Sequence, residues 1–158
     1  LFQADYYLGI DLVKGPGGDE GADVRARAAR EPRPAFDVVV SCETLEHDAA
    51  PFVFLSACSD VLSPCGALLL TCATEPRRAH GRNGWPIRDC PGEHYKNVSP
   101  ADLASWLGAA GFESHDLVVD AVRGDLFALA RKRRPVAPAK VTAATTPAAR
   151  GKGSAGVR

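Results

Sequence analysis

Methionine is absent from all 158 residues of the chain, which begins with Leu1. Because a complete translation product begins with methionine, we expect further residues upstream, and the sequence is silent on any N-terminal targeting signal. Long apolar runs are missing too. The longest, residues 66–71, has the length of a strand, whereas a membrane-spanning helix needs about 20 residues. The sequence therefore argues against a membrane protein.

Paired cysteine spacings are also missing. The chain has five cysteines, an odd number, and no two of them form a C-x-x-C pair. Zinc sites usually show such close pairs, so the sequence predicts no metal site. We interpret the five cysteines as reduced thiols of a cytoplasmic protein.

Acidic residues are absent from the end of the chain, where residues 131–158 carry eight Lys and Arg. This stretch is rich in Ala, Pro, Thr and Gly and buries too little apolar surface to offset the entropy of ordering it. We therefore predict one folded domain over residues 1–132 and a disordered basic tail over residues 133–158. Such a tail could contact nucleic acid or another polyanion, but its lack of aromatic residues favours an inert tail.

Strand and helix patterns alternate along the folded part. Apolar runs predict strands at residues 6–12, 22–24, 36–41 and 67–72 and an antiparallel hairpin at 114–120 and 125–131. The continuous apolar run at 36–41 is typical of a strand covered on both faces, as in a parallel sheet. Residues 26–34 are polar, contain two prolines and are predicted to be a connection. The alternation indicates an α/β fold with right-handed crossovers.

Two helices are marked by their end signals. Asp48 is expected to cap the first, with Pro51 in its first turn. Its apolar face is predicted to hold Phe52, Leu55, Cys58 and Leu62. Residues 63–66 should then turn the chain. Ser99 is expected to cap the second helix, with Pro100 at its first position, and Gly111 to end it.

Residues 73–98 form a long loop without regular periodicity. Compact domains rarely carry such a loop unless it serves as a lid or binding element. Its basic residues could favour an anionic acceptor, although solvated surface charge explains them equally well. Trp85 is either a cover for a substrate ring or a residue that packs the loop against the domain.

Polar residues follow the predicted strands at their carboxyl ends, where ligands bind in open α/β sheets. A carboxylate there can accept both hydroxyls of a ribose. We interpret Asp11 in this way, with a turn acid before the glycine-rich loop as the alternative. For Asp23, an adenine contact and a helix cap or surface acid both stay open. The stretch DVVVSCETLEH at residues 37–47 opens as a buried strand and ends in Glu43, Glu46 and His47, which indicates a ligand crevice.

Three stretches carry a family resemblance through their order and spacing: FDVVVSCETLEH from residue 36, VLSPCGALLLTC from residue 61 and SPADLASWLGAAGF from residue 99. Over roughly residues 7–132 the chain resembles a class I S-adenosylmethionine-dependent methyltransferase of the small-molecule type. The resemblance implies a Rossmann-like three-layer α/β/α sandwich with a mostly parallel sheet. It also implies S-adenosylmethionine as cofactor and methyl transfer to an oxygen or nitrogen of an unidentified small molecule.

The resemblance further assigns cofactor contacts to Ile10, Asp11, Leu12, Asp23, Val24, Ser41, Cys42, Glu43 and Glu46. Asp11 would hold the ribose, Asp23 and Val24 would border the adenine, and residues 41–43 would line the methionine side. The segment 45–47 would lie under the cofactor, near the methyl group.

A general base helps methyl transfer when the nucleophile is a hydroxyl or a protonated amine. The candidates are His47, His80 and His94, each with a surface or loop histidine as the alternative. Tyr95 is a candidate orienter and, with Trp85, a candidate substrate contact.

The chain departs from the family in two places. The first strand and its G-x-G-x-G loop are absent, and GPGG at residues 15–18 follows the second strand, so it is no substitute. We therefore expect the neighbouring strands to expose unpaired edges or to pair with each other. Cys65 stands where the family usually has Gly, which costs about 1 kcal/mol or more if its φ is positive.

Three alternatives to an active methyltransferase stay open. The chain could be a non-catalytic truncated domain, or a polyanion-binding module that uses its basic tail. It could also be a nicotinamide-dependent oxidoreductase, because that class shares the acid after a second strand. The context of residues 45–47 favours methyl transfer.

Overall fold

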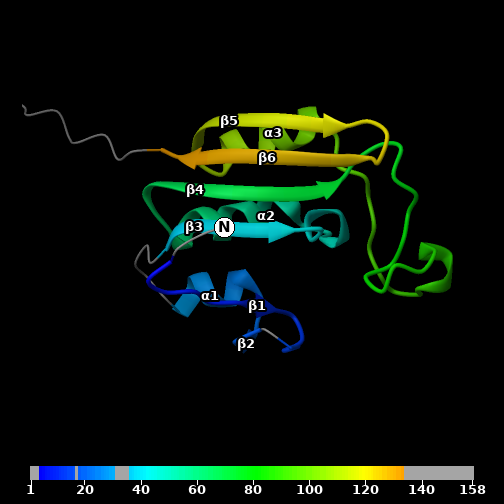
Figure 1. The fold of residues 1–158 in the computed structure, drawn as a ribbon, viewed down its shortest axis with the longest axis horizontal. Coiled ribbons are helices and arrows are strands. Elements are labelled where there is room, and N and C mark those ends of the chain that lie inside the picture. The colour runs from blue at the N-terminus through cyan, green and yellow to red at the C-terminus, as the bar shows by residue number, and fades with distance from the viewer. Residues whose placement is uncertain (1–3, 17, 31–35, 134–158) are drawn as a thin grey trace, which may run out of the picture.

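The computed structural model describes residues 4–16, 18–30 and 36–133, which form two sheets (Figure 1). The larger sheet has the order β3-β4-β6-β5, and the smaller one pairs β1 with β2. The larger sheet consists of β3 (Phe36–Cys42), β4 (Leu62–Ala73), β5 (Phe112–Asp120) and β6 (Asp125–Lys132). Strand β3 runs parallel to β4, whereas β6 is antiparallel to both β4 and β5. The predicted strands at 36–41 and 67–72 and the terminal hairpin are thus confirmed.

The N-terminal unit differs most from the prediction. Only Ile10–Asp11 (β1) of the predicted strand 6–12 is a strand, paired in parallel with Glu20–Gly21 (β2). The predicted strand at 22–24 is wrong, because helix α1 (Val24–Arg30) begins inside it. Asp23 Oδ1 accepts a hydrogen bond of 2.7 Å from the Arg25 backbone N–H, which is the geometry of a helix cap. Part of the predicted connection 26–34 is therefore helix, and residues 31–35 lie outside the described residues.

Helix α2 (Pro51–Val61) follows the short 3-10 helix η1 (Leu45–His47). Its cap position is Ala50, so the prediction of Asp48 as the cap is wrong. Asp48 Oδ1 instead accepts from the Ala50 N–H at 2.7 Å, and Asp48 Oδ2 pairs with Arg25 at 2.5 Å, which ties α1 to α2. The helix buries Phe54, whereas Phe52, predicted for the apolar face, is 43% exposed.

Helix α3 (Pro100–Ala109) and the hairpin follow their local signals. Ser99 Oγ accepts a hydrogen bond from the Asp102 N–H at 3.0 Å, as the predicted cap requires. Gly111 comes just after the helix with φ +92°, and Gly124 turns the hairpin with φ +73°. Both angles lie in the left-handed region that glycine enters without steric cost. These boundaries are therefore confirmed.

The two faces of the larger sheet differ in cover. Helices α2 and α3 lie behind it in Figure 1 and bury Leu68, Leu70 and Leu126 in one core. The other face, which we call the open face, exposes Val38, Val40, Val118, Phe127 and Leu129 by 36–63% and holds a hollow of about 340 Å³. Among the described residues, one helical layer of the predicted three-layer sandwich is therefore present, and the prediction that residues 36–41 are covered on both faces is wrong.

The edges and the turn at Cys65 agree with the expected departures. Strand β3 ends its sheet and β1 pairs only with β2, so among the described strands the expected edges are exposed and the alternative, a pairing of β1 with β3, is not found. The predicted turn at 63–66 is an irregular stretch inside β4: Phe36 pairs with Leu62, and Val38 with Ala67. Cys65 has φ +66° there, which costs a non-glycine residue about 1–2 kcal/mol. No helix of the described residues is long and apolar enough to cross a membrane.

Candidate functional site

The candidate site begins where β3 ends. Glu43 follows the strand with φ +51°, and its backbone N–H donates to Thr71 O at 2.9 Å. The short helix η1 (Leu45–His47) that follows packs against β4 and α2 (Pro51–Val61). Leu45 and Glu46 are consequently buried in η1. Strained residues of this kind cluster at functional sites.

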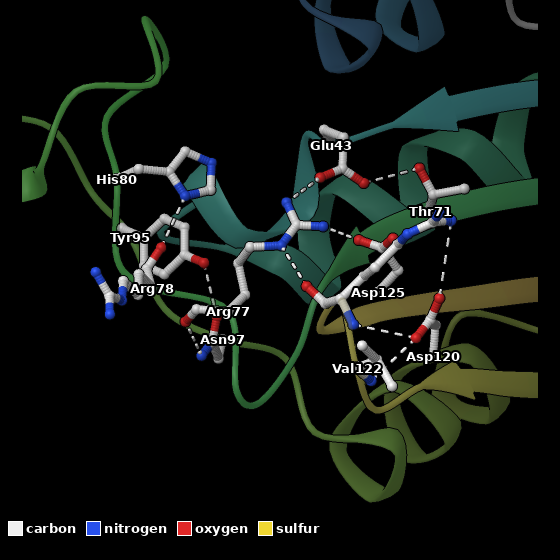
Figure 2. A network of polar contacts seen from close by, with 11 residues as sticks. Glu43, Thr71, Arg77, Arg78, His80, Tyr95, Asn97, Asp120, Val122 and Asp125 are labelled. Carbon is white, nitrogen blue, oxygen red and sulfur yellow. Dashed lines mark hydrogen bonds and ion pairs between the residues drawn. The ribbon is translucent and has the colours of Figure 1, made fainter.

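Arg77 anchors the long loop to three strand ends (Figure 2). Its guanidinium pairs with Asp125 at the start of β6 and donates to Glu43 Oε2 at 3.2 Å. Its Nε donates to Arg123 O at 3.0 Å. Thr71 Oγ1 in β4 donates to Glu43 Oε1 at 3.0 Å. We call these five residues the Arg77 network, and in it both oxygens of Glu43 have partners.

Tyr95 is held by the same loop. Asn97 Nδ2 donates to Arg77 O at 2.8 Å, and the Tyr95 hydroxyl donates to Asn97 Oδ1 at 2.7 Å. Burial raises the pKa of Tyr95 to about 12, and the nearby Glu46 carboxylate adds to the shift. The phenol therefore stays protonated at neutral pH.

Two of the three candidate bases meet beside Tyr95. The ring centroids of His47 and His80 lie 5.2 Å apart, and those of His80 and Tyr95 lie 4.7 Å apart. Figure 2 shows His80 next to Tyr95. His47 comes from η1 and the other two from the loop. His94 does not join them through its ring, which is exposed, although its backbone oxygen contacts His47.

Glu46 is fully buried, and a carboxylate oxygen lies within 4.8 Å of a ring nitrogen of His47 and of His80. Neither of its carboxyl oxygens has a hydrogen-bond partner. Burial raises its pKa to about 7, and the neighbouring Glu43 carboxylate adds to the rise. Backbone N–H groups of Glu46 and Ala73 offset part of the shift, yet none reaches hydrogen-bond geometry. A buried carboxyl without partners is rare and indicates a functional role.

The two histidines hold their protons on defined nitrogens. His80 Nδ1 lies 3.0 Å from Arg78 O, and His47 Nδ1 lies 3.4 Å from His94 O. A carbonyl oxygen only accepts, so each Nδ1 is placed to donate, and in the neutral tautomer that makes this bond Nε2 is the ring nitrogen with the lone pair. Burial also lowers the pKa of His47, which favours its neutral form. One ligand atom each of Glu46, His47 and His80 lies within 4.8 Å of the other two, so the three are candidate metal ligands.

The predicted cofactor residues fall into two groups. Near β1, Asp11 and Leu12 are exposed and Ile10 packs against the core. Asp11 Oδ1 accepts from the Leu12 N–H at 2.6 Å. Asp23 makes the predicted alternative, a helix cap, and Val24 is buried in α1.

The second group lies at the end of β3, beside Glu43 and Glu46. Ser41 is buried and its hydroxyl lacks a hydrogen-bond partner, whereas Cys42 is exposed. Of the predicted substrate contacts, Tyr95 lies at the histidine pair. Trp85 is 64% exposed, so the alternative that it packs the loop against the domain is wrong.

The sequence interpretation missed most of the Arg77 network, and no local signal could have found it. Arg77 and Glu43 are 34 residues apart, and Arg77 and Arg123 are 46 apart. The structure shows where the two segments meet: at Gly124 a Cβ would lie 2.5 Å from the Arg77 backbone nitrogen. That glycine was expected only as a turn residue.

Comparisons with known proteins identify the family of the chain. A family model described as a methyltransferase domain matches residues 2–117. A ubiquinone biosynthesis O-methyltransferase of Xanthomonas euvesicatoria pv. vesicatoria is 34% identical over 97 residues, which cover 57% of this chain and 40% of that protein. The enzyme of the same name from Azorhizobium caulinodans is 31% identical over 100 residues, with the same coverage. The matched part thus spans well under half the length of these relatives.

Solved structures show the same fold at low identity. A SAM-dependent methyltransferase from Archaeoglobus fulgidus has a TM-score of 0.60 at 16% identity, covering 79% of this chain and 75% of that one. The 1,6-didemethyltoxoflavin-N1-methyltransferase of Burkholderia thailandensis has a TM-score of 0.56 at 19% identity, covering 78% and 60%. The predicted Rossmann-like α/β class is confirmed. Neither the polyanion-binding nor the oxidoreductase alternative finds support in these relatives.

Proposed function

Since the chain belongs to the class I S-adenosylmethionine-dependent methyltransferases, we propose that it transfers the methyl group of that cofactor to an oxygen of a small-molecule acceptor. The grouping of Glu46, His47, His80 and Tyr95 after β3 carries this proposal. The names of the relatives, O-methyltransferases at 31–34% identity, support oxygen over nitrogen as the target.

The residues at the strand ends fit the cofactor. The buried hydroxyl of Ser41 lacks a partner at the end of β3, and Asp11 is exposed at the end of β1. Asp11 would accept the ribose hydroxyls, and residues 41–43 would line the methionine part. The cofactor supplies an electrophilic methyl group, whose C–S bond breaks with its electron pair left on sulfur as the new O–C bond forms.

The acceptor hydroxyl must lose its proton in this reaction. The Nδ1 atoms of His47 and His80 face backbone carbonyls, and burial lowers the pKa of His47, which favours a neutral ring that can take a proton. The histidine pair is therefore the place in the described structure where an acceptor oxygen can be activated. The Arg77 network holds the loop that carries His80 and thereby positions His80 next to His47. In this proposal the network does not contact the acceptor.

The cofactor part of the proposal is tested by calorimetric titration with S-adenosylhomocysteine. We expect the wild-type chain to bind it and Asp11→Ala to bind at least tenfold more weakly, because a charged acceptor for the ribose is lost. Asp37→Ala is the matched control, since Asp37 is also an exposed strand acid but lies at the opposite end of the larger sheet. A folded chain that binds no S-adenosylhomocysteine contradicts the proposal.

A further inference from the structure

The side chain of Asn97 lies between Tyr95 and the backbone of Arg77 and is hydrogen-bonded to both (Figure 2). Its Nδ2 donates to Arg77 O at 2.8 Å, and its Oδ1 accepts from the Tyr95 hydroxyl at 2.7 Å. A carbonyl oxygen only accepts hydrogen bonds, so the contact with Arg77 O fixes which end of the amide faces the tyrosine. The Tyr95 hydroxyl is therefore the donor in its bond to Asn97.

The backbone around Asn97 is held independently of its side chain. The Lys96 N–H donates to Glu46 O at 2.9 Å, and the Val98 N–H donates to Ala73 O at 2.8 Å. These two bonds tie the neighbours of Asn97 to η1 and to the end of β4. Removing the amide therefore frees its bonding partners without releasing the backbone.

The ring of Tyr95 contacts both histidines of the candidate site. Its centroid lies 5.4 Å from that of His47, with the planes at 68°, and 4.7 Å from that of His80, with the planes at 57°. An aromatic pair contributes about 0.5–1.5 kcal/mol beyond its buried area. Fixing a side chain costs up to about 2 kcal/mol in conformational entropy. Because these terms nearly cancel, the hydrogen bond to Asn97, worth about 0.5–1.5 kcal/mol, decides whether the ring stays in this orientation.

The same bond defines what Tyr95 can do at the site. The hydroxyl has one proton, and that proton is directed at Asn97 Oδ1. Tyr95 consequently presents its ring to the histidines and does not donate its proton to them or to an acceptor.

We propose that Asn97 is a positioning residue of the candidate active site. It holds the Tyr95 ring against His47 and His80, so it fixes the orientation of the two rings that activate the acceptor. Asn97 acts through Tyr95 and not on the acceptor. The catalytic consequence rests on the proposed methyl transfer, whereas the positioning itself does not.

The test is nuclear magnetic resonance of the full chain with labelled histidine rings, because a neighbouring aromatic ring shifts their proton signals. The chain has four histidines, so replacing each in turn assigns the signals. Tyr95→Leu removes the ring and defines the full shift of the His47 and His80 signals. We expect Asn97→Ala to produce most of that shift, although this variant keeps the ring.

Tyr95→Phe separates the hydrogen bond from the packing. It keeps the ring and loses the hydroxyl, so it should shift the two histidine signals as Asn97→Ala does. The double variant should add nothing further, because both changes remove the same bond. If Asn97→Ala does not fold, Tyr95→Phe carries the test alone.

Asn83→Ala is the matched control. Asn83 is an amide of the same loop, but its Oδ1 accepts from the Trp85 N–H at 3.0 Å. The variant should leave the His47 and His80 signals unchanged. The signal of His115, in β5, is the internal reference and should not move in any variant.

Three results would overturn the inference. They are unchanged His47 and His80 signals in folded Asn97→Ala, wild-type signals in Tyr95→Phe, and equal shifts in Asn83→Ala. The first two would mean that packing alone holds the ring.

Calorimetric titration of the same samples with S-adenosylhomocysteine separates the two proposals. Asn97→Ala should bind it as the wild type does. Binding with unchanged histidine signals leaves the function and removes the positioning role. Shifted signals in a chain that binds no S-adenosylhomocysteine leave the positioning and remove the function.

Discussion

Glu43 and Glu46 lie three residues apart after the same strand, yet their surroundings are opposite. Glu43 is partly exposed and both its oxygens have partners, Thr71 and Arg77. Glu46 is fully buried and both its oxygens lack partners. Glu43 has a structural role, because its hydrogen bonds to Thr71 and Arg77 join the end of β3 to β4 and to the long loop. Glu46 lowers the stability of the protein when it is ionised, because a buried charge then lacks any partner.

Among these predictions, the largest loss of stability is expected from Gly124→Ala, which disrupts the Arg77 network that holds Glu43. The added Cβ would lie 2.5 Å from the Arg77 N and 2.8 Å from Thr74 O, at a φ of +73°. The turn and the loop must separate, which weakens the Arg77–Asp125 pair. We expect a loss of about 4 kcal/mol in the free energy of unfolding, measured in urea.

Gly84→Ala is the control for this clash. Gly84 has a similar φ of +80°, but a Cβ there would meet nothing within 4 Å. The variant should cost only the left-handed backbone penalty, about 1 kcal/mol. Equal losses in the two variants would mean that the contact with Arg77 has no energetic weight.

The effect of the buried Glu46 carboxyl on the pH dependence of stability is measured with Glu46→Gln in metal-free buffer. The folded pKa of Glu46 is about 7, above its ordinary value of 4.5, so the folded state keeps a proton that the unfolded state releases. The stability from this proton is fully present below about pH 4.5 and is lost as the pH rises through 7. Wild-type stability should therefore fall by up to about 3 kcal/mol between pH 5 and 8.

The Gln variant should lack this fall, because it stays neutral throughout. Urea unfolding at both pH values measures the difference. Glu113→Gln, an exposed acid of β5, is the control and should keep the wild-type dependence. A wild type whose stability is flat over this range would show that Glu46 is ionised or solvated in the folded state.

The smallest change in stability is expected at Cys65, which, like Glu43, has a backbone φ in the left-handed region. Cys65 has φ +66° and Glu43 has φ +51°, but only Glu43 uses its side chain to hold other strands. Cys65→Gly should raise the free energy of unfolding by about 0.5 kcal/mol, the strain relieved less the extra entropy of an unfolded glycine. Glu43→Gly should lower it, because the bonds to Thr71 and Arg77 are lost.

Cys65→Ala is the matched control, since alanine keeps the Cβ that causes the strain. It should leave stability nearly unchanged, as measured by urea unfolding of all three variants. A gain from alanine equal to that from glycine would assign the effect to the thiol and not to the backbone.

The elements that the sequence predicted well are those with local signals. Ser99 caps α3 within its own first turn, and Gly111 and Gly124 permit φ angles that other residues resist. The wrong strand at 22–24 had a competing local signal of the same strength, because Asp23 caps a helix as readily as it ends a strand.

The parts that could not be predicted depend on distant partners. An apolar run such as 36–41 predicts a strand but does not say which face is covered, and Val40 proved 56% exposed. The meeting of His47 with His80 depends on how the loop closes, and no periodicity encodes that path. Glu46 is buried where η1 packs against β4 and α2, and the segment enters this packing through Glu43, whose positive φ favours glycine and is not expected of a glutamate.

The open face of the sheet has a practical consequence for all these measurements. Val40, Phe127 and Leu129 present a continuous apolar surface on the native protein. Fluorescent dyes that report unfolding do so by binding such surface, so we expect them to be bright before any heat is applied. Trp106, packed against the core from α3, offers an intrinsic signal that does not depend on a dye.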